Sequence, residues 1–192
     1  MAEFLPAYKR TMKNEGGDFA WSDNPNDPGR ETVMGISRVH WPDEPVWAVV
    51  DAAKTKSNFP RNLCFTQLPQ LARDFYKRNF WDALNLDRMA NQEVAEKVFD
   101  IGVNASPKVA AKILQRALNA ANRREKLWPN LPVDGVIGDQ TLEALGVCVG
   151  AGRIKGLMAG IRVLHGSHYM TLMQENERLE EFYMGWLARA ME

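Results

Sequence analysis

Hydrophobic residues recur at helical spacing along most of the chain. Phe4, Tyr8 and Met12 lie at positions i, i+4 and i+8, so they predict a first amphipathic helix. Gly16-Gly17 is expected to end this helix, because glycine adopts the left-handed cap conformation without strain. Similar stripes predict further helices over Pro45 to about Lys54, Thr66 to Trp81, Asn91 through Ile101, Ser106 through Leu118, Gly138 through Leu145, about Gly152 through Leu164, and Leu179 through Leu187.

The remaining segments favour loops. Residues 18–37 are rich in Asp, Asn, Pro and Gly, which is typical of an irregular segment with room for a short hairpin. Residues 122–135 are charged and contain proline. Asn91 and Ser106 have side chains suited to cap the helices that follow them. The sequence therefore predicts an all-α fold, mostly helical, with at most a small β-hairpin.

Composition narrows the function classes. The 192 residues are 45% hydrophobic and 25% charged, which is typical of a globular protein. Lys+Arg and Asp+Glu both number 24, and this balance argues against a nucleic-acid partner. Cys64 and Cys148 belong to no ligand-type cluster, so buried free thiols are expected, with one long-range disulfide as the alternative.

The N-terminal residues do not read as a signal peptide, because they lack a continuous apolar stretch and carry Glu3. No run of about 18 apolar residues indicates a membrane span. Synthesis in the cytoplasm is therefore expected. A substrate outside the membrane would require a dedicated release route.

Carboxylates gather in the irregular segment 14–37, and Glu15 is the one in an unusual position. It lies at the C-terminal end of the first predicted helix, just before two glycines. The helix carbonyl groups there disfavour an ionised carboxylate, and partial burial would raise its pKa further. A raised pKa suits a general acid, although a surface glutamate at a helix end is the structural alternative.

Several short motifs occur in one order along nearly the whole chain. They are Glu15-Gly16-Gly17, Asp27-Pro28-Gly29, Thr32, Gly35-Ile36, Phe99-Asp100, Asn104, Leu114-Gln115, Val133 to Gly138, Thr141, Gly185-Trp186 and Arg189. This ordered set resembles the glycoside hydrolase family 108 lysozymes, the N-acetylmuramidase-like enzymes of phages and prophages that are also called secretion activating proteins. The later motifs look like that family's C-terminal peptidoglycan-binding half.

The resemblance implies a lysozyme-like helical fold and cleavage of the muramic acid–glucosamine linkage in bacterial peptidoglycan. It implies a catalytic region over residues 1–95 and a helical peptidoglycan-binding region over residues 96–192, packed on the first. For an endolysin of this kind it also implies release to the cell wall through a holin. The family usually continues Asp-Pro-Gly with a second glycine, whereas here Arg30-Glu31 follows and places two bulkier charged residues near the predicted cleft.

Glycoside hydrolysis assigns roles to the candidate residues. The family's catalytic glutamate falls on Glu15, which would protonate the leaving oxygen. Asp27 is the candidate second carboxylate, with a structural role in the Pro28-Gly29 turn as the alternative. Thr32 is a candidate to hold a water through its hydroxyl. A carboxyl separation of about 5 Å would indicate retention and roughly 6.5–9.5 Å inversion.

Candidate sugar contacts are Trp21, Asn104 and Gln115. Trp21 lies in the loop beside Glu15, and an aromatic face can pack on a sugar ring. Asn104 and Gln115 are polar residues on otherwise apolar helices, so they either satisfy hydrogen bonds in the core or reach the N-acetyl groups of the glycan. Aromatic residues elsewhere that could stack on sugars or belong to the core are Trp41, Tyr76 and Trp81.

No cofactor or metal is needed for this chemistry, and the three scattered histidines lack metal-ligand spacing. Two other functions are compatible with the sequence. A lytic transglycosylase would use one acid/base and leave a 1,6-anhydro sugar. A non-catalytic peptidoglycan-binding or secretion-accessory protein would bind cell walls without lysing them.

Overall fold

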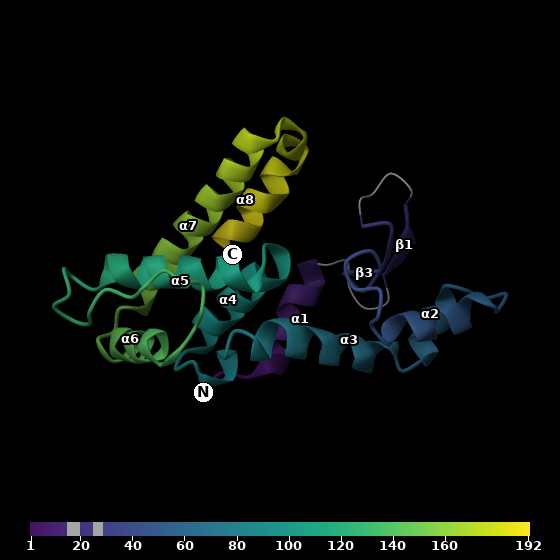
Figure 1. Ribbon diagram of the computed structural model, residues 1–192, viewed down its shortest axis with the longest axis horizontal. Helices are drawn as coiled ribbons and strands as arrows, with labels where there is room; N and C mark the ends of the chain where they lie inside the picture. Colours follow the sequence, from purple (N-terminus) through teal and green to yellow (C-terminus); the bar gives the residue numbers. More distant parts are fainter. Residues whose placement is uncertain (15–19, 25–28) are drawn as a thin grey trace. The chain divides into compact units, whose positions relative to one another are not determined.

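The computed structural model describes residues 1–14, 20–24 and 29–192, which divide into two compact units (Figure 1). The N-terminal unit comprises Phe4–Asp82. The C-terminal unit comprises Ala83–Glu192 together with Met1–Glu3. Helices dominate both, and a three-stranded sheet lies in the N-terminal unit, so the predicted mostly helical class is confirmed. The described units are 4–82 and 83–192, whereas the predicted division at residue 95 stays a prediction.

Short elements make up the N-terminal unit. The helices expected at residues 4 and 46 are present, and the one expected over 66–81 begins at Leu68 and continues from residue 77 as a π-helix. The elements are α1 (Phe4–Asn14), β1 (Trp21–Asp23), β2 (Glu31–Val33), β3 (Ile36–Ser37), α2 (Val46–Lys54), the 3-10 helix η1 (Arg61–Phe65), α3 (Leu68–Tyr76) and the π-helix η2 (Lys77–Asp82).

Longer helices make up the C-terminal unit. Asn91 and Ser106 cap as predicted: their side-chain oxygens accept from the amides of Val94 at 3.0 Å and Val109 at 3.3 Å. The last predicted helix is divided into a 3-10 turn and an α-helix. The elements are η3 (Leu86–Arg88), α4 (Gln92–Asn104), α5 (Pro107–Ala121), α6 (Asp139–Gly150), α7 (Ile154–Glu175), η4 (Glu177–Phe182) and α8 (Tyr183–Met191).

The irregular segment forms an antiparallel sheet with strand order β1-β2-β3, which extends the predicted hairpin by one strand. Met34 and Gly35 link β2 to β3 with φ values of 49° and 76°. Two consecutive positive φ values match the twist of a two-residue hairpin, and glycine accepts its position without strain. The Tyr76 hydroxyl donates to the Met34 carbonyl at 2.8 Å, so α3 holds this turn.

Aromatic side chains fill the core of the N-terminal unit. Phe75 and Tyr76 are 2% exposed, Trp81 is 1% exposed, and Tyr8 contacts Tyr76 with ring centroids 5.8 Å apart. Of the two alternatives that the sequence left open for Tyr76 and Trp81, burial therefore supports the core and excludes stacking on a sugar. Trp41 is 37% exposed, and its ring meets Phe75 edge-on.

The two cysteines differ in environment. Both are free, and Cys148 is buried as expected. Cys64 is exposed, so the expectation of a buried thiol is wrong there. It lies on the solvent side of η1, where its thiol donates to the Arg61 carbonyl at 3.0 Å.

A row of amide side chains on α5 organises the long segment that follows it. Gln115 and Asn119 lie on α5 and Asn122 is its C-cap residue; their spacing of i, i+4 and i+7 places them along one face of the helix. Gln115, 1% exposed, donates to Asp134 at 2.7 Å and to the Val136 carbonyl at 2.9 Å, and it accepts from the Gly135 amide at 3.0 Å. Gln115 therefore satisfies backbone groups that would otherwise be unpaired.

The other two amides continue this pattern. Asn119 exchanges two hydrogen bonds with the backbone of Leu131, at 2.8 and 2.7 Å. Asn122, 2% exposed, donates to Asn130 at 2.8 Å and accepts from the Glu125 amide at 3.2 Å. These contacts fix a segment that has little regular structure of its own. We call Gln115, Asn119 and Asn122 the amide row.

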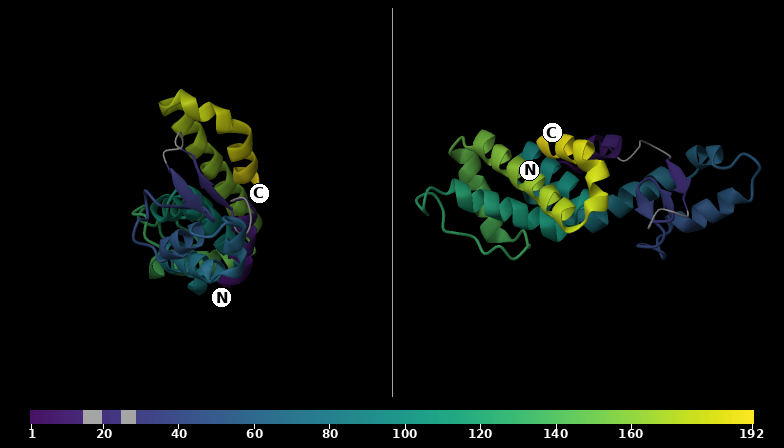
Figure 2. Two further views of the ribbon diagram at one scale, coloured as in Figure 1. Left: turned by 90° about the vertical axis from the view of Figure 1, so that its right-hand side faces the viewer. Right: turned by 90° about the horizontal axis from the view of Figure 1, so that it is seen from above.

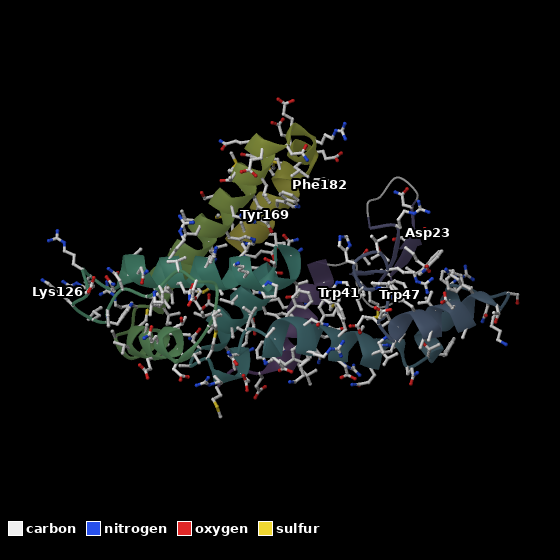
Figure 3. All side chains as sticks on the ribbon, viewed as in Figure 1. Asp23, Trp41, Trp47, Lys126, Tyr169 and Phe182 are labelled. Carbon is white, nitrogen blue, oxygen red and sulfur yellow. The ribbon has the colours of Figure 1, made fainter. Side chains whose placement is uncertain are left out.

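Helices α7 and α8 run side by side as an antiparallel pair (Figures 1 and 2). The ring of Tyr169 on α7 lies tilted against that of Trp186, with centroids 4.8 Å apart, and Trp186 stacks in turn on Phe182. Figure 3 labels Tyr169 and Phe182. Asp100 of α4 pairs with Arg189 of α8 at 2.9 Å. This partly buried ion pair ties the helical pair to α4.

His165 lies in the middle of this region and is fully buried. Neither ring nitrogen has a hydrogen-bond partner among the described residues. Burial, reinforced by the nearby charges of Lys97 and Arg189, lowers its pKa from 6.5 to about 3. The imidazole is therefore neutral at neutral pH.

Replacing Gln115 tests the amide row. Gln115→Leu keeps the volume but leaves the Gly135 amide and the Val136 carbonyl without partners. We expect the free energy of unfolding to fall by roughly 2–4 kcal/mol, measured by urea unfolding. Arg116→Ala, at the neighbouring exposed position, is the control and is expected to change stability by less than about 0.5 kcal/mol. Equal effects of the two substitutions would contradict the assigned role.

Replacing His165 tests the buried imidazole. The unfolded chain binds a proton near pH 6.5 and the folded chain only near pH 3, so acidification between these values favours unfolding. His165→Leu should remove this loss, which amounts to about 1.4 kcal/mol per pH unit. Thermal unfolding from pH 7.5 to 4.5 should therefore show a smaller decrease for the variant. The exposed His40→Leu variant should follow the wild type, and a His165→Leu profile parallel to the wild type would refute the argument.

Candidate active site

The small sheet presents two chemically different faces. Glu31 and Val33 are buried on one face of β2, and Thr32 points to the other because side chains alternate along a strand. Trp21 is the cross-strand partner of Val33, and Asp23 is the partner of Glu31. Carboxylates and indole therefore share one face, whereas hydroxyls share the opposite face.

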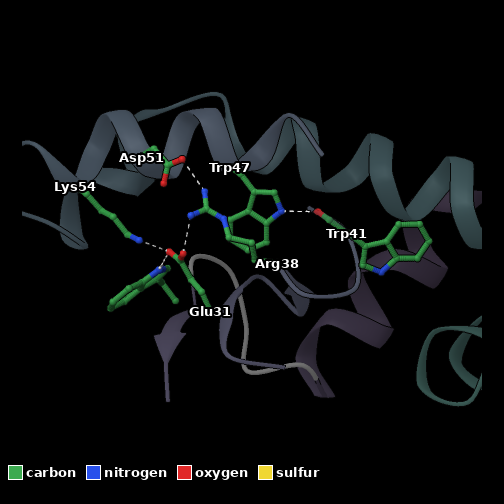
Figure 4. A network of polar contacts seen from close by, with 7 residues as sticks. Glu31, Arg38, Trp41, Trp47, Asp51 and Lys54 are labelled. Carbon is green, nitrogen blue, oxygen red and sulfur yellow. Dashed lines mark hydrogen bonds and ion pairs between the residues drawn. The ribbon is translucent and has the colours of Figure 1, made fainter. Parts of the chain in front are cut away.

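Glu31 is the centre of the first face (Figure 4). It is 7% exposed, and one carboxylate oxygen accepts from Lys54 at 2.6 Å and from the Trp21 indole nitrogen at 2.9 Å. The other oxygen accepts from Arg38 at 3.0 Å. Two cations and one neutral donor thus satisfy a carboxylate that has left bulk water. We call this the Glu31 network.

A second set of contacts orients these partners. Arg38 also donates to Asp51 at 2.7 Å, and its guanidinium lies over the Trp47 ring, 4.7 Å from the centroid. The Trp47 indole nitrogen donates to the Trp41 carbonyl at 2.6 Å. Trp47, Asp51 and Lys54 are spaced i, i+4 and i+7 on α2, so one face of this helix is directed at the sheet.

The positive charges of the network keep the Glu31 carboxylate deprotonated. Burial by itself would raise the pKa of Glu31, but hydrogen bonds from Lys54 and Trp21 and the charges of Arg38 and Lys54 outweigh it, so the pKa lies below 4.5. The hydrogen bond to Asp51 raises the pKa of Arg38 above its ordinary value. Glu31 is therefore an anion at neutral pH and is unsuited to donate a proton.

Arg30 and Glu31, the two residues at which the chain departs from the family motif, lie in different environments. Arg30 is exposed with a positive φ of 52°, whereas Glu31 is turned into the network. A surface pocket of about 400 Å³ lies here, lined by Asp23, Arg30, Glu31, Arg38 and Val39. Arg30 is therefore the charged residue of this pair that remains open to solvent.

Hydroxyl groups cross the opposite face. Ser22, Thr32 and Ser37 are cross-strand partners in the register, so their side chains form a row over the three strands. The Ser37 hydroxyl donates to the Gly29 carbonyl at 2.9 Å, and the His40 amide donates weakly to it at 3.4 Å. Thr32 occupies the centre of this row and is half-buried.

The predicted catalytic carboxylates, Glu15 and Asp27, lie outside the described residues. Their flanking elements are described: α1 ends at Asn14, and Asp27 belongs to the connection between β1 and β2. Thr32 and Trp21 lie on opposite faces of the same sheet. Trp21 is half-buried, with its indole nitrogen on Glu31 and its ring edge-on to Phe59 at 4.7 Å, so part of its surface is already used.

The other two predicted sugar contacts belong to the C-terminal unit. Asn104 is exposed at the end of α4, and its side-chain oxygen accepts from the Tyr169 hydroxyl at 2.5 Å. Gln115 is enclosed by the turn that it stabilises, so a glycan could reach its amide only if this turn opened. Sugar contact by either residue stays a prediction.

Sequence reasoning did not find Arg38, Asp51 and Lys54 as parts of one network. A signal was present in the i, i+4, i+7 spacing of Trp47, Asp51 and Lys54, which places charge on an otherwise apolar helix. Within the described ranges, no group of three or more His, Cys, Asp or Glu side chains could hold a metal ion. Every helix in the same ranges is too short or too polar to cross a bilayer.

Comparison with known proteins assigns the chain to a family. Residues 8–105 match the family model described as glycosyl hydrolase 108. The chain belongs to the glycosyl hydrolase 108 family. Residues 109–191 match a second model, described as a predicted peptidoglycan domain. The hydrolase thus combines a glycosidase region with a peptidoglycan-binding region.

A solved structure shows the same fold. The structure of SagA from Brucella abortus is 23% identical to the hydrolase, with a TM-score of 0.53 over 98% of this chain and 96% of that chain. The lysozyme-like, mostly helical fold expected from the sequence is therefore confirmed. No curated protein matches the chain.

Replacing Glu31 tests the network. Glu31→Gln keeps the shape but leaves Lys54 without its anion and Arg38 with Asp51 alone, and both cations are about one-third exposed. We expect a loss of about 2 kcal/mol in the free energy of unfolding at pH 7, less than for a fully buried pair. Asp51→Asn, at a more exposed partner of Arg38, should lose less than about 1 kcal/mol.

The stability difference between wild type and Glu31→Gln is expected to depend on pH. The folded pKa of Glu31 is depressed, so its stabilisation is present above pH 4.5 and is lost as pH falls through the lower folded pKa. Urea unfolding followed by tryptophan fluorescence should show a smaller gap between wild type and Glu31→Gln at pH 3 than at pH 7. A gap of constant size would show that Glu31 does not act through its charge.

Proposed function

We propose that the chain hydrolyses the glycan strands of bacterial peptidoglycan as a lysozyme-type muramidase, with Glu15 as the general acid. The family match over residues 8–105 carries this proposal, because it spans Glu15, Asp27 and Thr32. The peptidoglycan-binding match over residues 109–191 supports the same substrate. A hydrolase and a wall-binding region on one chain would act on one polymer.

The position of Glu15 supports its role. It follows α1 directly, and α1 is anchored in the N-terminal unit by the buried side chains of Tyr8, Thr11 and Met12. A helix fixed in this way has a fixed carbonyl end, and a carboxyl group beside that end resists ionisation. The pKa of Glu15 would then lie above that of a free glutamate, in the direction that a general acid needs to deliver its proton to the glycosidic oxygen.

Asp27 is the proposed second carboxylate. The connection that contains it begins and ends at a cross-strand pair, Asp23 and Glu31, so the network that holds Glu31 also holds one end of this connection. Glu31 is already an ion-pair partner for two cations. It therefore acts as a positioning residue, and the negative charge opposite the sugar would come from Asp27.

Thr32 supplies the third proposed group. Its hydroxyl lies between those of Ser22 and Ser37 on the face opposite the Glu31 network. A row of hydroxyls both donates and accepts hydrogen bonds, which suits a water molecule or sugar hydroxyls. Delivery to the cell wall, in the manner of a holin-released endolysin, stays a prediction.

Replacement of Glu15 tests the function. Glu15→Gln should lower the initial rate of clearing of a purified peptidoglycan suspension by at least about 100-fold, since general acid catalysis contributes roughly 10²–10⁴-fold. The exposed Glu177→Gln variant is the matched control and should clear at the wild-type rate. Thermal unfolding should give equal Tm values for the three proteins.

The products separate the rival functions. A muramidase leaves reducing muramic acid ends, which mass spectrometry of the released fragments should show. A 1,6-anhydro end would instead identify a lytic transglycosylase. Sedimentation with walls without any clearing would identify a non-catalytic wall-binding protein, and undiminished clearing by Glu15→Gln would remove Glu15 from the mechanism.

A further inference from the structure

The surface pocket beside the Glu31 network has mostly charged walls. Its volume is about 400 Å³, within the range of small-ligand sites. It is lined by Asp23 of β1, by Arg30 and Glu31 where β2 begins, and by Arg38 and Val39 after β3. Figure 3 labels Asp23, and Figure 4 shows Glu31 and Arg38 with their partners. The pocket therefore combines two cationic and two anionic side chains with one apolar side chain.

Two of these four charges are already satisfied within the protein. Both carboxylate oxygens of Glu31 accept hydrogen bonds, one from Lys54 and Trp21 and the other from Arg38. Arg38 is shared between Glu31 and Asp51. These contacts fix one wall of the pocket and leave little charge there for a ligand.

The other two charges, Asp23 and Arg30, are available. Both residues are exposed, and among the described contacts neither side chain makes a hydrogen bond or an ion pair. They line the same pocket without pairing with each other in the described part of the chain. An anion and a cation left open in one pocket favour a ligand that carries both charges.

The position of Asp23 favours a cationic group. Asp23 is the cross-strand partner of Glu31, so two carboxylates lie opposite each other on neighbouring strands. Like charges in this arrangement repel each other. Lys54 and Arg38 compensate Glu31, whereas Asp23 has no such partner among the described residues. A ligand ammonium beside Asp23 would offset the repulsion.

The position of Arg30 favours an anionic group. Its φ of 52° is a conformation that glycine adopts without strain and that arginine adopts at a cost in free energy. Neither the backbone nor a described side-chain contact accounts for an arginine here. A carboxylate ligand suits this side chain, because a guanidinium binds a carboxylate through two parallel hydrogen bonds.

The pocket is close in the chain to a proposed catalytic residue. Asp23 and Arg30 flank the connection that contains Asp27, and Arg30 follows Asp27 by three residues, a chain length of at most about 11 Å. The third amino acid of a stem peptide lies at a comparable chain length from the muramic acid that carries it. A peptide attached to a sugar at the cleavage site could therefore reach the pocket.

We propose that this pocket binds the zwitterionic end of a stem peptide, an amino acid head with an ammonium and a carboxylate on one carbon. Arg30 binds the carboxylate and Asp23 the ammonium. Val39 is 56% exposed, so its side chain is accessible to the methylene chain of the ligand. Diaminopimelate that is not cross-linked carries such a head, whereas lysine carries the ammonium alone. The proposal rests on peptidoglycan as the proposed substrate and extends recognition from the sugars to the peptide.

Titration of the full chain with three tripeptides, followed by nuclear magnetic resonance, tests the site. The first is L-Ala-γ-D-Glu-meso-diaminopimelate. The second has lysine in place of diaminopimelate and lacks the terminal carboxylate, and the third is acetylated on the terminal amine and lacks the ammonium. The amide signals of Asp23 and Arg30 should shift in a saturable way, with a Kd at least about tenfold lower for the first peptide, because each lost group removes a charge-assisted hydrogen bond.

The wild-type titrations have outcomes that would overturn the proposal. Equal Kd values for the first and third peptides would indicate a general anion site. Equal values for the first and second would show that the carboxylate is not recognised, and the absence of any shift would remove the site.

Charge-removing variants assign each contact. Arg30→Gln should bind the diaminopimelate and lysine peptides with equal Kd, and Asp23→Asn should bind the free and acetylated diaminopimelate peptides equally. Arg61→Gln and Asp43→Asn make the same changes at exposed positions of the N-terminal unit and should keep the wild-type preferences. All four variants should have the wild-type Tm. A wild-type preference retained by Arg30→Gln or by Asp23→Asn would refute the contact assigned to that residue.

The catalytic proposal and the peptide site fail separately. The tripeptide preference should be the same in wild type and in Glu15→Gln, because the peptide site makes no use of Glu15. A retained preference with undiminished clearing by Glu15→Gln would refute the catalytic assignment alone. Lost clearing in Glu15→Gln without any tripeptide preference would refute the peptide site alone.

Discussion

The structure of the candidate active site depends on a carboxylate that has been taken out of water. Burying an unpaired charge costs a large amount of free energy, so the Glu31 carboxylate can be buried only together with partners. Lys54 and Arg38 provide the positive charge, and Trp21 adds a neutral hydrogen bond. These partners come from α2, from the segment after β3 and from β1, so satisfying one side chain positions most of the sheet.

In the C-terminal unit, buried backbone groups likewise need hydrogen-bond partners. Residues 122–136 contain little regular structure, and their amides and carbonyls need partners when they are covered. Gln115 and Asn119 on α5 and Asn122 at its C-cap supply them. The segment is thereby held in one shape. In both units, polar side chains on apolar helices determine the form of the irregular segments.

The two regions differ in the function that the family matches assign to them. The family match assigns glycoside hydrolysis to the region that contains the small sheet, and the peptidoglycan match assigns binding to the region that contains the amide row. Glu31 is the most buried carboxylate of the sheet, yet its depressed pKa makes it a structural anion. A general acid needs the opposite environment, one that raises its pKa, and we propose this role for Glu15, the residue that follows α1 in the sequence.

The sequence by itself determined the helices, their caps and the family. Periodicity located α1, α2, α4 and α5 because an apolar stripe and a capping side chain act locally, and Asn91 and Ser106 cap as their chemistry predicts. Only the tertiary structure decided which polar residues are structural. Gln115 bonds to Gly135, and Glu31 pairs with Lys54; in both pairs the partners are 20 or more residues apart in the sequence. A local sequence pattern cannot predict such contacts. The tertiary structure also decided that Tyr76 and Trp81 are core residues. Aromatic residues at helical spacing can lie in a core or on a surface, and only the packing of the helices determines which.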